Sequence, residues 1–135
     1  MTGILENLAA ARRSGRPAGI TSVCSAHPVV LRAAIRRAAA GKTPVLIEAT
    51  CNQVNHLGGY TGMTPRDFVT FVNSIAEEEG LPRELVIFGG DHLGPNPWPR
   101  EKAEDALTKA AAMVGAYVAA GFRKIHLGAS MGCDG

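Results

Sequence analysis

A carboxylate followed directly by an imidazole is the feature of this sequence best suited to chemistry. Asp91 and His92 lie in segment 89–97, which reads GGDHLGPNP. The two glycines before them let a backbone turn sharply or approach a ligand closely. A carboxylate can move protons and a neutral imidazole can bind a metal ion. The pair is a candidate site, and a structural aspartate beside a hydrogen-bonded histidine is the alternative.

Glu48 is a second candidate because it ends an otherwise apolar strand. Residues 45–49 read VLIEA, and buried carboxylates are seldom left without a partner. We expect Glu48 to face a ligand, a metal ion or a cation from a neighbouring strand. A buried structural ion pair is the alternative.

Amide side chains follow that strand at once. Asn52, Gln53 and Asn55 carry neutral donors and acceptors that suit sugar hydroxyls. We predict substrate-binding roles for Glu48 and these amides, although the amides could equally satisfy the backbone of their own loop. That loop, residues 50–63, is the longest irregular segment, and loops of such length are commonly functional.

His126 is a third candidate. It lies between Ile125 and Leu127, so its side chain points away from theirs if the segment is a strand. With Lys124 and His126 at inner positions, the imidazole would face the interior of a barrel. A hydrogen-bonded core histidine is the alternative reading.

Composition and charge exclude several classes of function. The chain has 135 residues, 46% hydrophobic and 19% charged, with a net charge of +2. This balance gives no reason to expect nucleic acid or an anionic membrane as a partner. No stretch approaches the roughly 20 apolar residues of a membrane span.

The cysteines and one glycine-lysine pair exclude further classes. Cys24, Cys51 and Cys133 form no C-x-x-C pair and no secretory segment is present, which favours a reduced, cytoplasmic protein. The segment 41–43, GKT, is not a phosphate-binding loop, because Arg36 stands where that motif needs its first glycine. The sequence therefore gives kinase chemistry no support.

Apolar runs and helical periods alternate along the chain. Such alternation predicts an α/β fold with parallel strands. One option is an open doubly wound sheet, which the absence of G-x-G-x-x-G after the first strand disfavours in its dinucleotide-binding form. The other is the N-terminal half of a TIM-type (β/α)8 barrel, which needs about 250 residues when whole. We predict a single partial barrel domain over residues 1–135, with strands at 19–23, 44–49, 85–89 and 124–127 and helices at 3–13, 28–40, 64–79 and 101–120.

Helix ends and faces can also be predicted. Thr64 is placed to cap a helix whose first turn holds Pro65 and Asp67. We expect the glutamates at 77–79 to face water and Gly41 to terminate the helix before the second strand. The side chains expected to point inward from the last helix are Ala103, Ala106, Leu107, Ala110, Val114, Tyr117 and Val118.

Long motifs carry a resemblance to a known family. They are SVCSAHP at 22–28, LIEAT at 46–50, NQVN at 52–55, GGYTGMTP at 58–65, GGDHLGPN at 89–96, AAGF at 119–122 and KIHL at 124–127. Together they closely resemble the accessory, so-called non-catalytic subunit of class II D-tagatose-1,6-bisphosphate aldolase, a family also labelled tagatose-6-phosphate kinase. The resemblance covers nearly the whole chain, but members of the family are much longer. The family usually has aspartate where this sequence has Gly128.

The resemblance implies a fold and a function. It implies a β/α barrel, a bacterial role in galactitol, N-acetylgalactosamine or tagatose catabolism, a sugar phosphate ligand and association with a catalytic aldolase subunit. By similarity to catalytic class II aldolases, Asp91 would be the acid or base. His92 would hold a divalent metal such as zinc, with Glu48 or His126 as companion ligands. The resemblance thus implies that the protein is a component of a lyase.

Two alternatives to the accessory role stay open. Some proteins resembling this family have been assigned sugar 4-epimerase activity, so the protein could be a metal-dependent ketose or ketose-phosphate aldolase or 4-epimerase in its own right. It could also be a truncated fragment without function. A partial barrel would expose strand edges, so we also expect the chain to form an oligomer.

Overall fold

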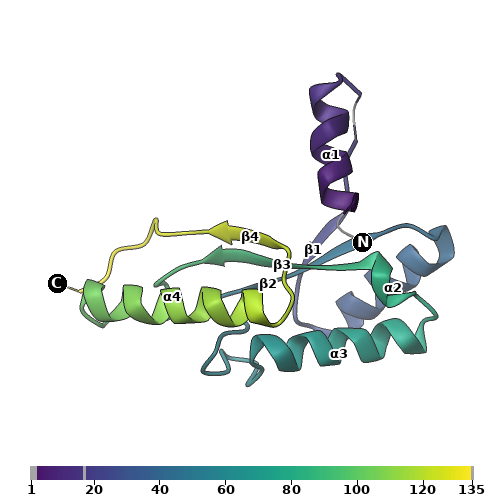
Figure 1. The fold of residues 1–135 in the computed structure, drawn as a ribbon. Helices are drawn as coiled ribbons and strands as arrows, with labels where there is room; N and C mark the ends of the chain where they lie inside the picture. The colour runs from purple at the N-terminus through teal and green to yellow at the C-terminus, as the bar shows by residue number, and fades with distance from the viewer. Residues whose placement is uncertain (1–2, 17, 135) are drawn as a thin grey trace.

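Strands and helices alternate along the whole chain, as predicted. The computed structural model describes residues 3–16 and 18–134, and its elements are labelled in Figure 1. In chain order they are α1 (Gly3–Arg13), β1 (Ser22–Cys24), α2 (Pro28–Gly41), β2 (Val45–Thr50), α3 (Pro65–Glu78), the 3-10 turn η1 (Arg83–Leu85), β3 (Val86–Leu93), α4 (Ala103–Ala119) and β4 (Lys124–Leu127). No helix in the described ranges is long and apolar enough to cross a membrane.

The strands form one parallel sheet. Its order is β1-β2-β3-β4, the order of the sequence. Sequential parallel strands linked by helices are the arrangement found in half of a (β/α)8 barrel. The predicted fold class is therefore confirmed, and the open doubly wound alternative, in which the strand order reverses, does not describe this sheet.

The helices cover one face of the sheet. Figure 1 shows α2, α3 and α4 on the same side, while α1 stands away from the sheet and contains no buried residue. Alternate strand residues such as Val45, Ile47 and Phe88 belong to the core beneath these helices. Since side chains alternate along a strand, Leu46 and Glu48 lie on the opposite face, which we call the inner face.

Two helix boundaries show how the sequence sets the elements. The Thr64 side chain accepts a hydrogen bond from the Asp67 N–H, and the Asp67 carboxylate accepts one from the Thr64 N–H, so the predicted cap is confirmed as a capping box. The predicted stop at Gly41 is wrong by one residue. Gly41 is still helical, and Lys42 takes the left-handed conformation (φ 50°) that ends α2.

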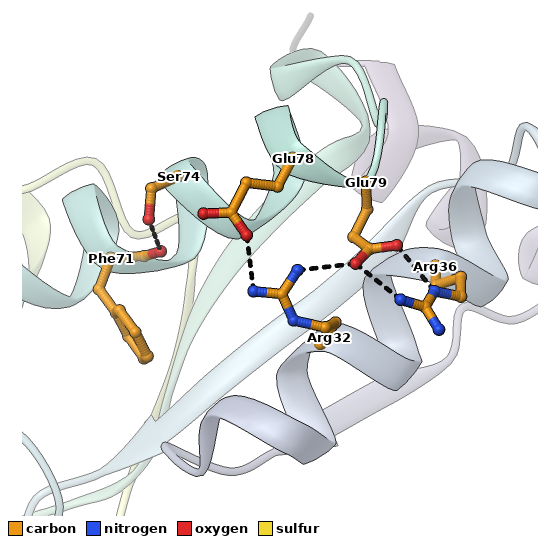
Figure 2. A network of polar contacts seen from close by, with 6 residues as sticks. All are labelled: Arg32, Arg36, Phe71, Ser74, Glu78 and Glu79. Carbon is orange, nitrogen blue, oxygen red and sulfur yellow. Dashed lines mark hydrogen bonds and ion pairs between the residues drawn. The ribbon is translucent and has the colours of Figure 1, made fainter.

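Two of the glutamates at the end of α3 belong to an ion-pair network with α2. Figure 2 shows Arg32 and Arg36 of α2 pointing toward Glu78 and Glu79. Arg32 contacts Glu78 at 2.6 Å and Glu79 at 2.7 Å, and Arg36 contacts Glu79 at 2.7 Å. Glu78 faces water as expected, with its side chain 57% exposed, but the expectation was wrong for Glu79, whose side chain is 11% exposed. Helical periodicity cannot show a charged partner on a neighbouring helix.

Burial along α4 also differs from the prediction. Ala106, Ala110 and Tyr117 are buried as expected, but Leu107 and Val118 are 52% and 57% exposed. Met113 takes an inward position instead and is fully buried. A helix rich in alanine has no sharply apolar stripe, so its buried face could not be assigned accurately from spacing.

The third strand is longer than predicted, and this places the candidate site on the sheet itself. β3 continues to Leu93, so Asp91 and His92 belong to the strand rather than to a loop after it. Gly89 and Gly90 are strand residues with ordinary φ values, not turn residues. They make room for neighbouring side chains, since a Cβ on Gly89 would lie 2.9 Å from Glu48 Cγ.

Candidate functional site

A charged cluster spans the inner face near the carboxyl ends of the strands. His126 Nδ1 lies 2.8 Å from Asp91 Oδ1, and Lys124 Nζ lies 3.7 Å from the same oxygen. Lys124 Nζ also contacts Glu48 Oε2 at 3.0 Å. The structure thus brings together three predicted site residues from three neighbouring strands, Glu48, Asp91 and His126, and adds Lys124, which contacts two of them.

A glycine allows two members of this cluster to meet across an intervening strand. Glu48 of β2 is in register with Gly89 of β3, and Gly89 is in register with Lys124 of β4. Because Gly89 has no side chain, the carboxylate and the ammonium can reach each other above it. Glu48 is 3% exposed, so its ion pair with Lys124 satisfies a buried charge, one of the partners that the sequence had left open.

His126 is not a core histidine. Its side chain is 53% exposed and projects to the inner face, where it contacts Asp91. This hydrogen bond is the main cause that holds the pKa of Asp91 below its usual range, with the nearby Lys124 charge acting in the same direction. Asp91 is therefore a carboxylate at neutral pH, able to accept a proton.

His92 lies beside this pair in an unusual backbone conformation. The register between β3 and β4 shifts between Gly90 and Leu93, and His92 within that irregularity has φ 53°. Its ring meets the ring of His126 edge to face, with centroids 5.8 Å apart. Strained residues of this kind gather at functional sites, which supports His92 as a site residue.

A thiol from the first strand completes the cluster. Burial, and after it the charge of Asp91, raise the pKa of Cys24 to about 11, so this side chain is a neutral thiol at physiological pH. Cys51 lies deeper, and its thiol donates a hydrogen bond to the His92 carbonyl at 3.2 Å. Both cysteines are free, as are all three in the described part of the chain.

The amides of loop 50–63 divide into two groups. Asn55 is 4% exposed; its Nδ2 donates to the Cys51 carbonyl, and its Oδ1 accepts from the N–H groups of Leu57 and Gly59. Gln53 Oε1 accepts from the Thr50 N–H. These two side chains thus serve their own loop, the alternative that the sequence left open.

Asn52 is the exposed member of the group. It borders a shallow surface hollow shared with Tyr60, Pro97 and Trp98, which come from the loops after β2 and β3. Asn52 is therefore the amide best placed to contact a ligand at this edge, while Gln53 and Asn55 shape the loop that carries it.

The predicted metal ligands do not form a metal site on their own. Within the described ranges, no three His, Cys, Asp or Glu side chains gather as a cation would require. Glu48 does not fit as a ligand, because its carboxylate already contacts the positive charge of Lys124. Zinc sites usually need three or four protein ligands, so His92 and His126 would need companions from elsewhere.

Lys124 is the site residue that sequence reasoning missed. The sequence marked it only as an inner position of the last strand, with no chemical role. The signal that could have found it is a lysine at the first position of the short strand KIHL, on the same side as His126 and in the same sheet row as Glu48. A buried carboxylate and a strand lysine are natural partners.

The cluster combines a proton carrier with a hydrogen-bond donor of fixed positive charge. Asp91 and His126 can pass a proton between a substrate hydroxyl and solvent. Lys124 can donate to an oxygen that carries or gains negative charge. Such a set suits a polyhydroxy carbonyl compound.

Comparisons with known proteins agree on one family. The family model described as D-tagatose-1,6-bisphosphate aldolase subunit GatZ/KbaZ-like matches residues 5–135. A D-tagatose 6-phosphate 4-epimerase of Agrobacterium fabrum is 89% identical over 135 residues, which cover 100% of this chain and 32% of that protein. The D-tagatose-1,6-bisphosphate aldolase subunit GatZ of Salmonella dublin is 54% identical over 129 residues, 96% of this chain and 30% of that protein.

A solved structure shows the same fold. A probable tagatose 6 phosphate kinase from Sinorhizobium meliloti 1021 superposes with a TM-score of 0.83 and is 61% identical, covering 87% of this chain and 30% of that one. The chain thus spans about a third of the length of the relatives it matches.

Proposed function

The chain belongs to the GatZ/KbaZ-like family of D-tagatose-1,6-bisphosphate aldolase subunits, and from this membership we propose that the protein is an accessory subunit of such an aldolase. In this role it supports the activity and stability of a catalytic subunit in tagatose or galactitol catabolism. The observation that carries the proposal is the 54% identity to a subunit of that name over 96% of the chain.

The site supports a ligand of the class that this role requires. Asp91, His126 and Lys124 form a polar cluster on the inner face of the sheet, and Asn52 is an exposed residue of the loop that follows β2. We propose that a ketose phosphate binds there, because carboxylate, imidazole and amide groups match its hydroxyls. Ligands commonly bind at the carboxyl ends of parallel strands.

The accessory role can be tested by reconstitution. The intact protein would be purified with and without a catalytic tagatose-bisphosphate aldolase subunit, and aldol cleavage would be measured for each partner alone and for the mixture. The proposal expects the mixture to be more active and more heat-stable than the catalytic subunit alone. No co-purification and no change in either property would contradict it.

A second candidate function is 4-epimerisation of D-tagatose 6-phosphate. It is favoured by the 89% identity to a protein named for that activity and by the proton-carrying pair of Asp91 and His126. The intact protein alone, supplied with D-tagatose 6-phosphate, would then form the C4 epimer without any aldolase subunit. Conversion that needs the aldolase partner would favour the accessory role instead.

Metal dependence is a separate part of this proposal. His92 and His126 are the described side chains that could contribute to a zinc site completed by other residues of the protein, and the metal would then polarise a substrate oxygen. Metal analysis of the intact protein and of a His92→Ala variant tests this. Equal metal content in both would remove His92 from the ligand set.

The partial barrel can be completed at the two edge strands of the sheet. We treat residues 1–135 as one partial barrel domain whose edge strands, β1 and β4, pair with further strands of the same protein or of another copy.

We place the protein in the cytoplasm, where free cysteines such as Cys24 and Cys51 stay reduced.

A further inference from the structure

We propose that Lys124 binds the carbonyl oxygen of the ketose, and that the phosphate group of the ligand lies outside the charged cluster. This inference rests on the proposed ketose-phosphate ligand and assigns the carbonyl end of that ligand to Lys124. It gives a substrate-binding role to a lysine that also pairs with the buried carboxylate of Glu48.

The position of Lys124 leaves its ammonium group open to a ligand. Its side chain is 33% exposed, whereas that of its partner Glu48 is 5% exposed. The carboxylate is therefore the covered member of the ion pair and the ammonium is the member that faces the inner side of the sheet. A ligand on this side would meet Lys124 before Glu48.

Lys124 has hydrogen-bond donors to spare. An ammonium group carries three donors and no acceptor. One donor is used by Glu48 at 3.0 Å, while Asp91 at 3.7 Å is too distant for a hydrogen bond. Among the residues that the structure describes, at least one N–H therefore has no partner and can bind an acceptor such as a carbonyl oxygen.

The local charge decides which end of the ligand enters. Glu48 and Asp91 are two carboxylates beside one ammonium, so the cluster is negative when His126 is neutral. A phosphate dianion would be repelled by this arrangement. A neutral carbonyl and its hydroxyls are not repelled, and the carboxylates can accept hydrogen bonds from those hydroxyls.

The neighbouring groups match this orientation. Asp91 and His126 lie 2.8 Å apart on the same face as the Lys124 ammonium. With the ketose carbonyl on Lys124, hydroxyl groups farther along the sugar come within reach of that pair. Any negative charge that develops on the carbonyl oxygen would be stabilised by the adjacent positive charge.

The experiment compares two ligands that differ only at the carbonyl. Binding of D-tagatose 6-phosphate and of one purified C2 epimer of the hexitol phosphate obtained by reducing it would be measured by calorimetry on the intact protein and on Lys124→Met. The wild-type protein should prefer the ketose. The variant should bind the ketose roughly tenfold or more weakly, as expected for loss of a charged hydrogen bond, and the hexitol phosphate about as before.

Control variants separate binding from structure. Lys109→Met removes an ion-paired lysine outside the cluster, which contacts Glu101 at 2.7 Å, and should change neither affinity. The double variant Lys124→Met with Glu48→Gln removes the unpaired buried charge; if Lys124 only neutralised Glu48, this double variant would regain wild-type preference for the ketose. Lys124→Arg, which keeps the positive charge, should retain part of the preference.

Several results would overturn the inference. If Lys124→Met weakens both ligands equally, the lysine binds a group that they share, such as the phosphate. If borohydride in the presence of D-tagatose 6-phosphate fixes the sugar covalently to Lys124, the lysine is a nucleophile and not a hydrogen-bond donor. A wild-type protein that binds neither ligand contradicts the proposed function itself, a result distinct from a selective failure at Lys124.

Discussion

The imidazole ring of His92 occupies the space that a side chain on Gly128 would need. A Cβ placed on Gly128 would overlap the ring atoms of His92. The backbone at His92 is also held in the left-handed region, at φ 53°. The position of the His92 ring therefore depends on two features: the irregularity in β3 and the absence of a side chain at Gly128. A chain with aspartate at 128 must place this ring differently.

The variant Gly128→Ala should displace the His92 ring while leaving the fold intact. We expect ligand binding or turnover to fall, and a crystal structure or the histidine resonances in an NMR spectrum to report a moved ring. Gly132→Ala is the matched control, because nothing lies within 4 Å of a Cβ placed there. An unmoved ring in Gly128→Ala would contradict the steric coupling.

Replacing Asp91 by asparagine tests the proton-carrying pair. Asp91→Asn keeps the size of the side chain but removes the group whose pKa is lowered by His126. We expect turnover to fall by about 10²–10⁴-fold if Asp91 moves the proton, with little change in the unfolding midpoint. Asp105→Asn, at an exposed position of α4, should leave turnover unchanged. Equal turnover in wild type and Asp91→Asn would rule out the role.

A buried tyrosine ties α4 to the loop that follows β2. The Tyr117 hydroxyl donates to the Val54 carbonyl at 2.8 Å, and the side chain is fully buried. Tyr117→Phe leaves that carbonyl without its partner, so the free energy of unfolding should fall by about 1–3 kcal/mol. Denaturant titration measures this. Tyr60→Phe is the control, since Tyr60 is 74% exposed; similar losses in both variants would argue against a specific tether.

Acid should weaken the network between α2 and α3 over a defined range of pH. Hydrogen bonds from Arg36 and then Arg32 lower the pKa of Glu79 from 4.5 to about 2. Because the folded pKa lies below the unfolded one, the stabilisation is complete above 4.5 and is lost as the pH falls through about 2.

The check is a pair of unfolding titrations against pH. The stability difference between wild type and Glu79→Gln should be constant near neutral pH and should shrink steadily below the unfolded pKa of Glu79. Glu84→Gln, an exposed glutamate in η1 without an ion pair among the described residues, should show no such trend. If the stability difference between wild type and Glu79→Gln does not depend on pH, the charge of Glu79 does not contribute to stability.

Local patterns were enough to predict most of the fold. The Thr64 cap and the alternation of apolar runs depend on neighbours within a few residues, so they can be read from the chain alone. Burial on α4 was harder to predict, because Leu107 and Met113 differ in exposure only through what packs against the helix. Strand β3 was underestimated because glycines usually interrupt strands, whereas Gly89 here makes room for Glu48.

The individual residues of the candidate site could be predicted from the sequence, but the contacts between their side chains could not. Asp91, His126 and Glu48 were each identified from residue type and position. The link between Glu48 and Lys124 joins residues 76 positions apart and depends on the register of three strands. Likewise, the carboxamide of Asn55 could not be assigned to the loop backbone without knowing how that loop folds back on itself.

The internal bonds of loop 50–63 have a thermodynamic consequence for recognition. Asn55 brackets the turn at Leu57 and Gly59, and the Thr61 hydroxyl donates to the Gln53 carbonyl at 2.6 Å. The loop is thereby ordered during folding rather than on encounter with a ligand. Association would then cost little conformational entropy in this segment. We accordingly expect binding at this edge to be fast and to leave the loop backbone nearly unmoved.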